Sequence, residues 1–161
     1  PQARAVAERA ARAALDAQRP KTPAAVEISI ALGDDALLAR LNREWRGVDG
    51  ATNVLSFPST GARGTLSEQG SRRGPPLVLG DVVLARETVC AEAAAQQKSL
   101  AAHASHLVVH GVLHLLGHDH GSESESDAME GLETRILAAL GIGDPYAVPQ
   151  PGGHAQATVE K

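Results

Sequence analysis

Hydrophobic positions recur along this chain with two different periods, and their alternation divides it into predicted helices and strands. Residues 2–18 are rich in Ala, Arg and Leu and contain no breaker, which predicts an amphipathic helix ending before Pro20. Residues 26–30 alternate apolar and polar side chains, as a half-buried strand does. The other predicted elements are a helix capped by Asp34 or Asp35 with Leu37, Leu38, Leu41 and Trp45 along one face, strands at 53–57 and 77–85, and helices at 87–97, 100–116 and 125–140.

The predicted helix at 100–116 determines the expected architecture. It is apolar on most sides, and a helix of this kind belongs in the middle of a fold. We therefore expect an α+β fold in which a small mixed sheet of about four strands packs around this central helix, with further flanking helices. Residues 1–146 are expected to form a single domain. Residues 147–161, which are rich in Pro, Gly and polar side chains, are expected to form a disordered C-terminal tail.

Histidines are concentrated on and just after this helix: six of the seven lie between His103 and His120. His110 and His114 are four residues apart, so their side chains stand one above the other on the same helix face. Gly117 is expected to end the helix, because glycine tolerates the left-handed conformation of a C-terminal cap. The chain can then reverse its direction and bring His120 close to His110 and His114. This spacing predicts one Zn²⁺ per chain on His110, His114 and His120, with a fourth coordination position open to water.

The same spacing of histidines and glycine occurs in the extended signature of the metzincin peptidases. Those enzymes carry a glutamate general base directly after the first histidine, where this chain has Gly111. A metallopeptidase is therefore a less favoured hypothesis.

Two residues close to the three histidines in the sequence have two interpretations each. His106 either supports the ligands or makes a packing contact or local hydrogen bond, and Asp119 either binds a ligand imidazole or stabilises the turn.

The block His-Gly-Val-Leu-His-Leu-Leu-Gly-His-Asp-His at 110–120 resembles the signature of the YbeY family of bacterial ribosomal-RNA maturation endoribonucleases. Blocks at 41–46, 52–58, 79–83 and 132–134 resemble further family motifs in the same order, so the resemblance covers roughly residues 26–146. It implies a zinc-dependent endoribonuclease that cleaves single-stranded RNA in ribosomal-RNA processing and ribosome quality control. The implied partners are ribosomal-RNA precursors and the ribosome or one of its subunits. The family tolerates other residues at His118, which is not an expected ligand.

Arg46 and His114 are the candidate catalytic residues. Arg46 closes a predicted helix, and from the sequence alone its favoured role is an interaction with the helix dipole. The resemblance implies more, because family members carry an arginine implicated in activity at the matching position. A guanidinium can hold a phosphate at two points and stabilise charge that develops on it. Zinc would lower the pKa of water towards about 7, but no residue of the signature is an obvious general base.

Two residues of the matching blocks have alternative interpretations. Ser56 either lines the groove or is a buried hydroxyl bonded to the backbone. Asp81, which follows Gly80, either orients neighbouring groups or belongs to a turn or bulge. The competing function is a non-catalytic, zinc-containing ribosome assembly factor. A fourth protein ligand such as His106 or Asp119 would favour that structural role over the enzyme.

Composition narrows the expected partners and location. The net charge of −4 argues against a protein that coats nucleic acid indiscriminately. A basic groove could still bind one strand, and aromatic residues are too few for an extended stacking platform. The single cysteine, Cys90, suits a reducing compartment. Because no apolar run approaches the ~18 residues of a membrane span and no signal pattern is visible, we expect a cytoplasmic protein with neither membrane nor DNA as a partner. The cations that could line the groove are Arg43, Arg46, Arg63, Arg72, Arg73 and Arg86.

Overall fold

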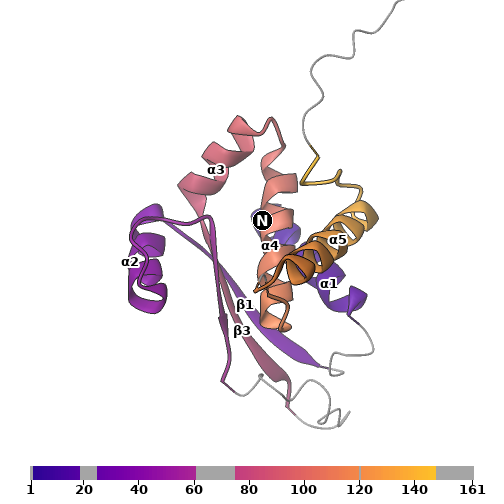
Figure 1. Ribbon diagram of the computed structural model, residues 1–161, viewed down its shortest axis with the longest axis horizontal. Helices are drawn as coiled ribbons and strands as arrows, with labels where there is room; N and C mark the ends of the chain where they lie inside the picture. The colour runs from indigo at the N-terminus through magenta and orange to yellow at the C-terminus, as the bar shows by residue number, and fades with distance from the viewer. Residues whose placement is uncertain (1, 19–24, 61–74, 120, 148–161) are drawn as a thin grey trace, which may run out of the picture.

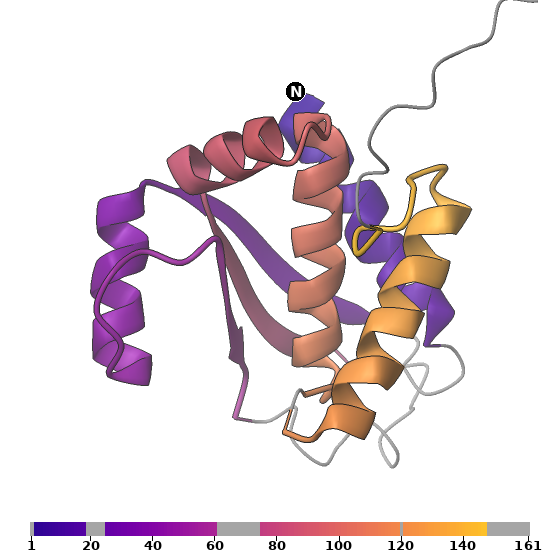
Figure 2. The same ribbon diagram turned by 45° about the horizontal axis from the view of Figure 1, so that its top comes forward.

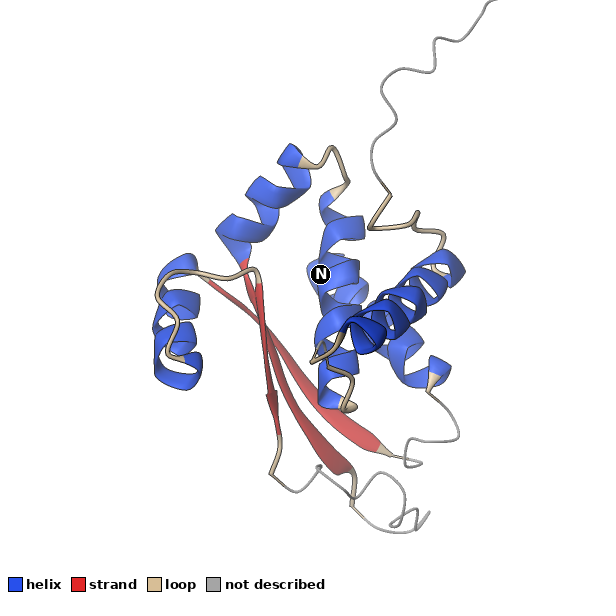
Figure 3. Cartoon of the chain, in the orientation of Figure 1, coloured by secondary structure: helices blue, strands red, loops and turns tan. Residues whose placement is uncertain are grey.

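The structure is a computed structural model that describes residues 2–18, 25–60, 75–119 and 121–147. Within them, helices lie on both faces of a small sheet (Figure 1 and Figure 3). Each element predicted from the sequence is confirmed, with its ends shifted by at most three residues. The elements are α1 (Gln2–Ala17), β1 (Val26–Gly33), α2 (Asp35–Arg46), β2 (Val54–Pro58), β3 (Leu77–Ala85), α3 (Arg86–Ala95), α4 (Leu100–Leu115) and α5 (Glu123–Ala139).

The sheet is mixed, as expected, with the strand order β1-β3-β2. The central strand β3 pairs in parallel with β1 and antiparallel with β2. The expectation of about four strands is wrong for the part of the chain that the structure describes, which forms three. The reason is that the other apolar segments repeat with the period of a helix, and the segment directly after β3 is rich in alanine, the strongest helix former.

The central strand has two buried faces, which divides the core into two clusters. Val82 and Leu84 belong to the larger cluster, which they share with residues of α1, α4 and α5. Ala85 belongs to the smaller cluster with Leu38 of α2 and Leu55 of β2. Figure 2 shows the result: α2 covers one face of the sheet, and α4 covers the other with α1 and α5 behind it. The central position predicted for α4 is therefore confirmed.

A β-bulge interrupts β3 at Gly80. The register with β1 shifts there, since Glu27 pairs with Val78 and Ile28 pairs with Gly80. Gly80 has a φ of +135°, and a Cβ at this position would lie 2.1 Å from the carbonyl oxygen of Phe57. Glycine is thus required by the close approach of β2, which supports the bulge interpretation of this block.

Both ends of α4 are capped, and Gly117 ends the helix as the sequence predicts. The Ser99 hydroxyl accepts a hydrogen bond from the Ala102 amide at 3.1 Å. At the other end Gly117 adopts a φ of +95°, and the His118 amide donates to the carbonyl of Leu113 at 3.0 Å, which closes a Schellman motif. In the described segments, neither α4 nor any other helix combines the length and apolarity that crossing a bilayer would take. The single-domain assignment stays a prediction, and residues 148–161 of the predicted tail lie outside the described residues.

Candidate metal centre

Helix α4 packs so closely on the sheet at Gly111 that no side chain fits there. A Cβ at this position would lie 2.6 Å from Cγ1 of Val82 and 3.0 Å from Oγ of Ser56. The Ser56 hydroxyl instead donates a hydrogen bond to the Gly111 carbonyl at 3.1 Å, which supports the backbone-bonded interpretation of Ser56. The position that carries the general base in metzincins therefore faces the core.

The histidines of α4 form a stripe beside this contact line. At about 100° per residue, His103, His106, His110 and His114 fall within about 80° of arc, all on the same flank of the helix relative to Gly111. Neighbouring rings are edge-on, with centroids 6.4 Å apart between His103 and His106 and between His106 and His110, and 4.6 Å apart between His110 and His114. Two members of the stripe, His106 and His110, face α5.

The closest pair in the stripe is the predicted ligand pair. The Nε2 atoms of His110 and His114 lie 3.1 Å apart. Two nitrogens bound to one zinc ion at 2.0–2.1 Å with a tetrahedral angle would be about 3.3 Å apart. The distance between the two nitrogens is thus close to that between two ligands of one ion. His110 is 23% exposed, so the pair is accessible from solvent.

Glu133 of α5 binds the ring nitrogen of His110 that points away from His114. Its side chain is fully buried, and Oε1 accepts a hydrogen bond from Nδ1 of His110 at 2.7 Å. Because the carboxylate accepts, Nδ1 carries the proton and the lone pair of His110 is on Nε2, the atom that faces His114. A carboxylate that binds the second nitrogen of a ligand imidazole in this way is typical of metal sites.

The second carboxylate oxygen of Glu133 has two further donors. Oε2 accepts from Nε2 of His106 at 2.9 Å and from the hydroxyl of Tyr146. Burial raises the pKa of Glu133, but the hydrogen bonds from His106, His110 and Tyr146 outweigh it and lower this pKa to about 2. Glu133 is therefore ionised at neutral pH. Burial and the bond to Glu133 raise the pKa of Tyr146, so the phenol keeps its proton and donates.

Both interpretations of His106, support of the ligands and a local hydrogen bond, agree with its contacts. It donates a hydrogen bond to Glu133, the same carboxylate that accepts from His110. The same bond engages Nε2 of His106. His118 lies after the end of α4, and its Nε2 is 3.2 Å from Oε1 of Gln18, just after α1. His103 binds Glu92 of α3 at 2.8 Å and so joins two helices.

His120, the third predicted ligand, lies outside the described residues. In the described ranges no group of three or more metal-binding side chains comes together, and the two-histidine pair is the part of the predicted set that can be located. The turn at Gly117 that is expected to return the chain is present. The assignment of His110, His114 and His120 as ligands stays a prediction that the located pair fits.

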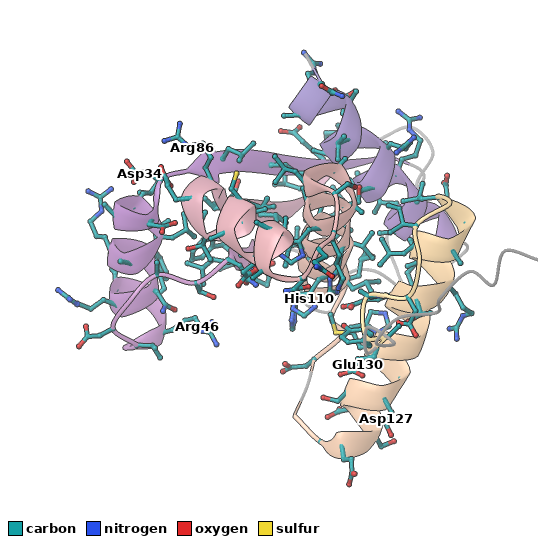
Figure 4. The ribbon with its side chains drawn as sticks, turned by 90° about the horizontal axis from the view of Figure 1, so that it is seen from above. Asp34, Arg46, Arg86, His110, Asp127 and Glu130 are labelled. Carbon is teal, nitrogen blue, oxygen red and sulfur yellow. The ribbon has the colours of Figure 1, made fainter. Side chains whose placement is uncertain are left out.

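Arg46 lies across the edge strand β2 from this pair. Trp45, its neighbour on α2, places its ring edge-on to Phe57 of β2 with a centroid distance of 5.8 Å. The residue before Phe57 is Ser56, which contacts Gly111 on the other face. Figure 4 shows Arg46 and His110 on the same side of the molecule. The end of α2 and the histidine stripe are therefore both next to β2.

Among the other candidate cations, Arg43 binds Asp49 at 2.6 Å, whereas no carboxylate in the described part of the chain pairs with Arg46. Arg86 binds Glu87 and lies beside Asp34 at the opposite end of α2 (Figure 4), so it does not belong to this neighbourhood. The remaining candidates are outside the described residues; they are Arg63, Arg72 and Arg73.

Glu133 is the site residue that the sequence analysis did not identify. It was part of a matching block, but nothing marked it as a partner of His110, which is 23 residues away. One signal was available. Glu133 occupies a core position of α5, in register with the buried residues Met129, Ile136 and Leu137. A carboxylate on the apolar face of a helix needs buried donors, and a neighbouring histidine helix can supply them.

Comparison with known proteins gives a consistent family. The family model described as Endoribonuclease YbeY matches residues 2–141. Three relatives carry the same name: one from Azorhizobium caulinodans is 50% identical over 153 residues, covering 94% of this chain and 91% of the relative. One from Parvibaculum lavamentivorans is 55% identical over 126 residues (78% and 68%), and one from Paramagnetospirillum magneticum is 58% identical over 123 residues (75% and 71%). A solution structure of a Thermotoga maritima protein aligns with 90% of this chain and 91% of its own at 18% identity and a TM-score of 0.49. The chain belongs to the Endoribonuclease YbeY family.

Proposed function

We propose that this protein is a zinc-dependent endoribonuclease that hydrolyses phosphodiester bonds in single-stranded RNA. The observation that carries the proposal is the pair of Nε2 atoms on His110 and His114, 3.1 Å apart, with the other nitrogen of His110 bound to an ionised carboxylate. The names of the relatives support the reaction class, because each is called an endoribonuclease.

Four residues of the chain have proposed roles in binding the zinc ion. His110, His114 and His120 would hold one zinc ion, and Glu133 keeps the lone pair of His110 on Nε2. Zinc bound there supplies Lewis acidity, which lowers the pKa of water towards about 7. Because His110 is partly exposed, water and substrate can reach the pair from solvent.

Arg46 would hold the phosphate. Its side chain is exposed at the end of α2, on the same side of the molecule as His110 (Figure 4). A guanidinium offers two parallel donors to a phosphate, and its fixed charge stabilises the negative charge that builds up there during displacement. This role needs a cation that is not already paired, which distinguishes Arg46 from Arg43.

The structure argues against the peptidase alternative on steric grounds. A metzincin-type glutamate would have to occupy position 111, where even a Cβ would lie 2.6 Å from Val82. Glu133 does not replace that base, because it is fully buried and both of its oxygens already accept hydrogen bonds. Neither Gly111 nor Glu133 can therefore serve as the proton acceptor of a peptidase beside the His110–His114 pair.

The non-catalytic alternative, a zinc-containing ribosome assembly factor, requires a fourth protein ligand that closes the site. His106, one of the two candidates, has its Nε2 bound to Glu133. This contact favours an open site and hence the enzyme. From the family resemblance we further propose ribosomal-RNA precursors as substrates, a ribosome or ribosomal subunit as partner, and the cytoplasm as location.

Incubation with labelled RNA and with casein tests the proposal. The zinc-loaded protein should cleave single-stranded RNA internally, cut the same sequence more slowly when it is annealed to its complement, and leave casein intact. Cleavage of casein without cleavage of RNA would support the peptidase instead. Stoichiometric zinc with neither activity would support the assembly factor.

A further inference from the structure

A residue beyond the last helix reaches back to the candidate metal centre. Tyr146 lies thirteen positions after Glu133, outside α5, and its hydroxyl donates a hydrogen bond to Oε2 of Glu133. Its ring is edge-on to His106 with a centroid distance of 5.5 Å. Tyr146 therefore contacts two members of the supporting network, Glu133 and His106.

The segment that carries Tyr146 is fastened to the fold on both sides. Lys98, between α3 and α4, donates from Nζ to the carbonyl of Pro145 at 2.6 Å. Asp144 accepts from the Tyr146 amide at 2.9 Å and from the Thr134 hydroxyl of α5 at 3.4 Å. Figure 2 shows this segment, in yellow, turning back from the end of α5 towards α4. The phenol is thus held in a defined place.

The hydroxyl of Tyr146 affects which hydrogen-bond donors bind each of the two carboxylate oxygens of Glu133. Tyr146 and His106 donate to Oε2, and His110 is the one described residue that donates to Oε1. A buried carboxylate that loses a donor becomes poorly solvated and turns towards the donors that remain. His110 would then have a less fixed partner, and the direction of its Nε2 lone pair would be less well defined.

We propose that Tyr146 is a positioning residue for the metal centre: its hydroxyl, together with His106, orients the Glu133 carboxylate so that Oε1 holds His110 with Nε2 directed at the metal. The inference rests on the proposed metal site. It assigns a role to Tyr146, which lies outside the matched residues 2–141 of the family model.

Tyr146→Phe tests this by removing only the hydroxyl. Zn²⁺ affinity of the purified full chain is measured by competition with a chromophoric chelator, and the melting temperature of the metal-free protein is recorded alongside. Loss of an outer partner of a metal ligand typically weakens binding by about 10–100-fold. We expect a loss of about tenfold for Tyr146→Phe.

Thr134→Val is the matched control. It deletes a hydroxyl that joins the same segment to α5, next to Glu133 in sequence but without a bond to its carboxylate. Its Zn²⁺ affinity should stay within about twofold of the original chain. Equal affinities for Tyr146→Phe and the original chain, or equal losses for both hydroxyl deletions, would overturn the inference.

A double-mutant cycle separates positioning from general stabilisation. Tyr146 acts through Glu133, so Tyr146→Phe should have no further effect on Zn²⁺ affinity in a Glu133→Gln background. The same tenfold loss in both backgrounds would contradict the mechanism. Glu133→Asp, which keeps the charge and withdraws the carboxylate, provides a second background if Glu133→Gln does not fold. Absence of Zn²⁺ binding by the original chain would contradict the proposed metal site itself, an outcome distinct from these.

Discussion

The Nε2 atoms of His110 and His114 lie 3.1 Å apart on successive turns of α4. His110 donates its Nδ1 proton to Glu133, so its Nε2 has a lone pair directed at the neighbouring ring. Two imidazole nitrogens approach this closely when a proton or a cation lies between them. The distance between the two Nε2 atoms is therefore compatible with one cation bound by both, as the zinc proposal requires.

His114→Ala should abolish tight zinc binding and lower the melting temperature of the zinc-loaded protein. Metal-binding free energy contributes to folding, by about 2.7 kcal/mol at a free metal concentration 100 times the dissociation constant. Elemental analysis after gel filtration and a thermal melt measure the two effects. His118→Ala is the control, because His118 is not an expected ligand and its Nε2 contacts Gln18, and it should retain zinc. A full equivalent of zinc in His114→Ala would refute the ligand assignment.

Arg46→Glu should reduce RNA cleavage and leave zinc content unchanged. A charge-assisted hydrogen bond contributes about 1.5–3 kcal/mol, so loss of the phosphate contact should lower kcat/KM at least about tenfold. Arg40→Glu makes the same charge change on α2, but six residues earlier and on another face of the helix. If the two variants cleave equally well, Arg46 has no special role.

Gly111→Ala should destabilise the fold although Ala is the better helix former. The new methyl group would meet Val82 at 2.6 Å, and overpacking of this kind costs about 1–3 kcal/mol against a propensity gain of about 1 kcal/mol. Urea unfolding should show a net loss. Gly131→Ala in α5, where the nearest atom would be 3.7 Å away, should instead be neutral or stabilising. A stabilised Gly111→Ala would mean that α4 does not contact the sheet as described.

Local signals in the sequence are sufficient to predict the helices and strands and the two histidines on α4 that form the closest pair of the candidate site. The bounds of β3 follow from a short apolar run, and the caps of α4 at Ser99 and Gly117 follow from hydroxyl capping and the freedom of glycine. All of these signals act within a few residues. The pairing of His110 with His114 also depends on one helical turn. These features are predictable because each depends on neighbours in the chain.

The rest of the site depends on how separate elements pack. Glu133 and Tyr146 reach the stripe because α5 and the segment after it are placed against α4, which no local pattern encodes. The same holds for Arg46, whose relation to His110 depends on α2 and α4 lying on opposite faces of a sheet that ends at β2. Trp45 illustrates the limit: it follows the apolar face of α2, yet it is 66% exposed.

The most direct test of the central claim is a zinc analysis combined with an RNA-cleavage assay before chelation, after chelation and after zinc is restored. We predict one equivalent of zinc per chain, loss of single-stranded RNA cleavage when the zinc is removed, and recovery when it is returned. Undiminished cleavage by the zinc-free protein would contradict the account.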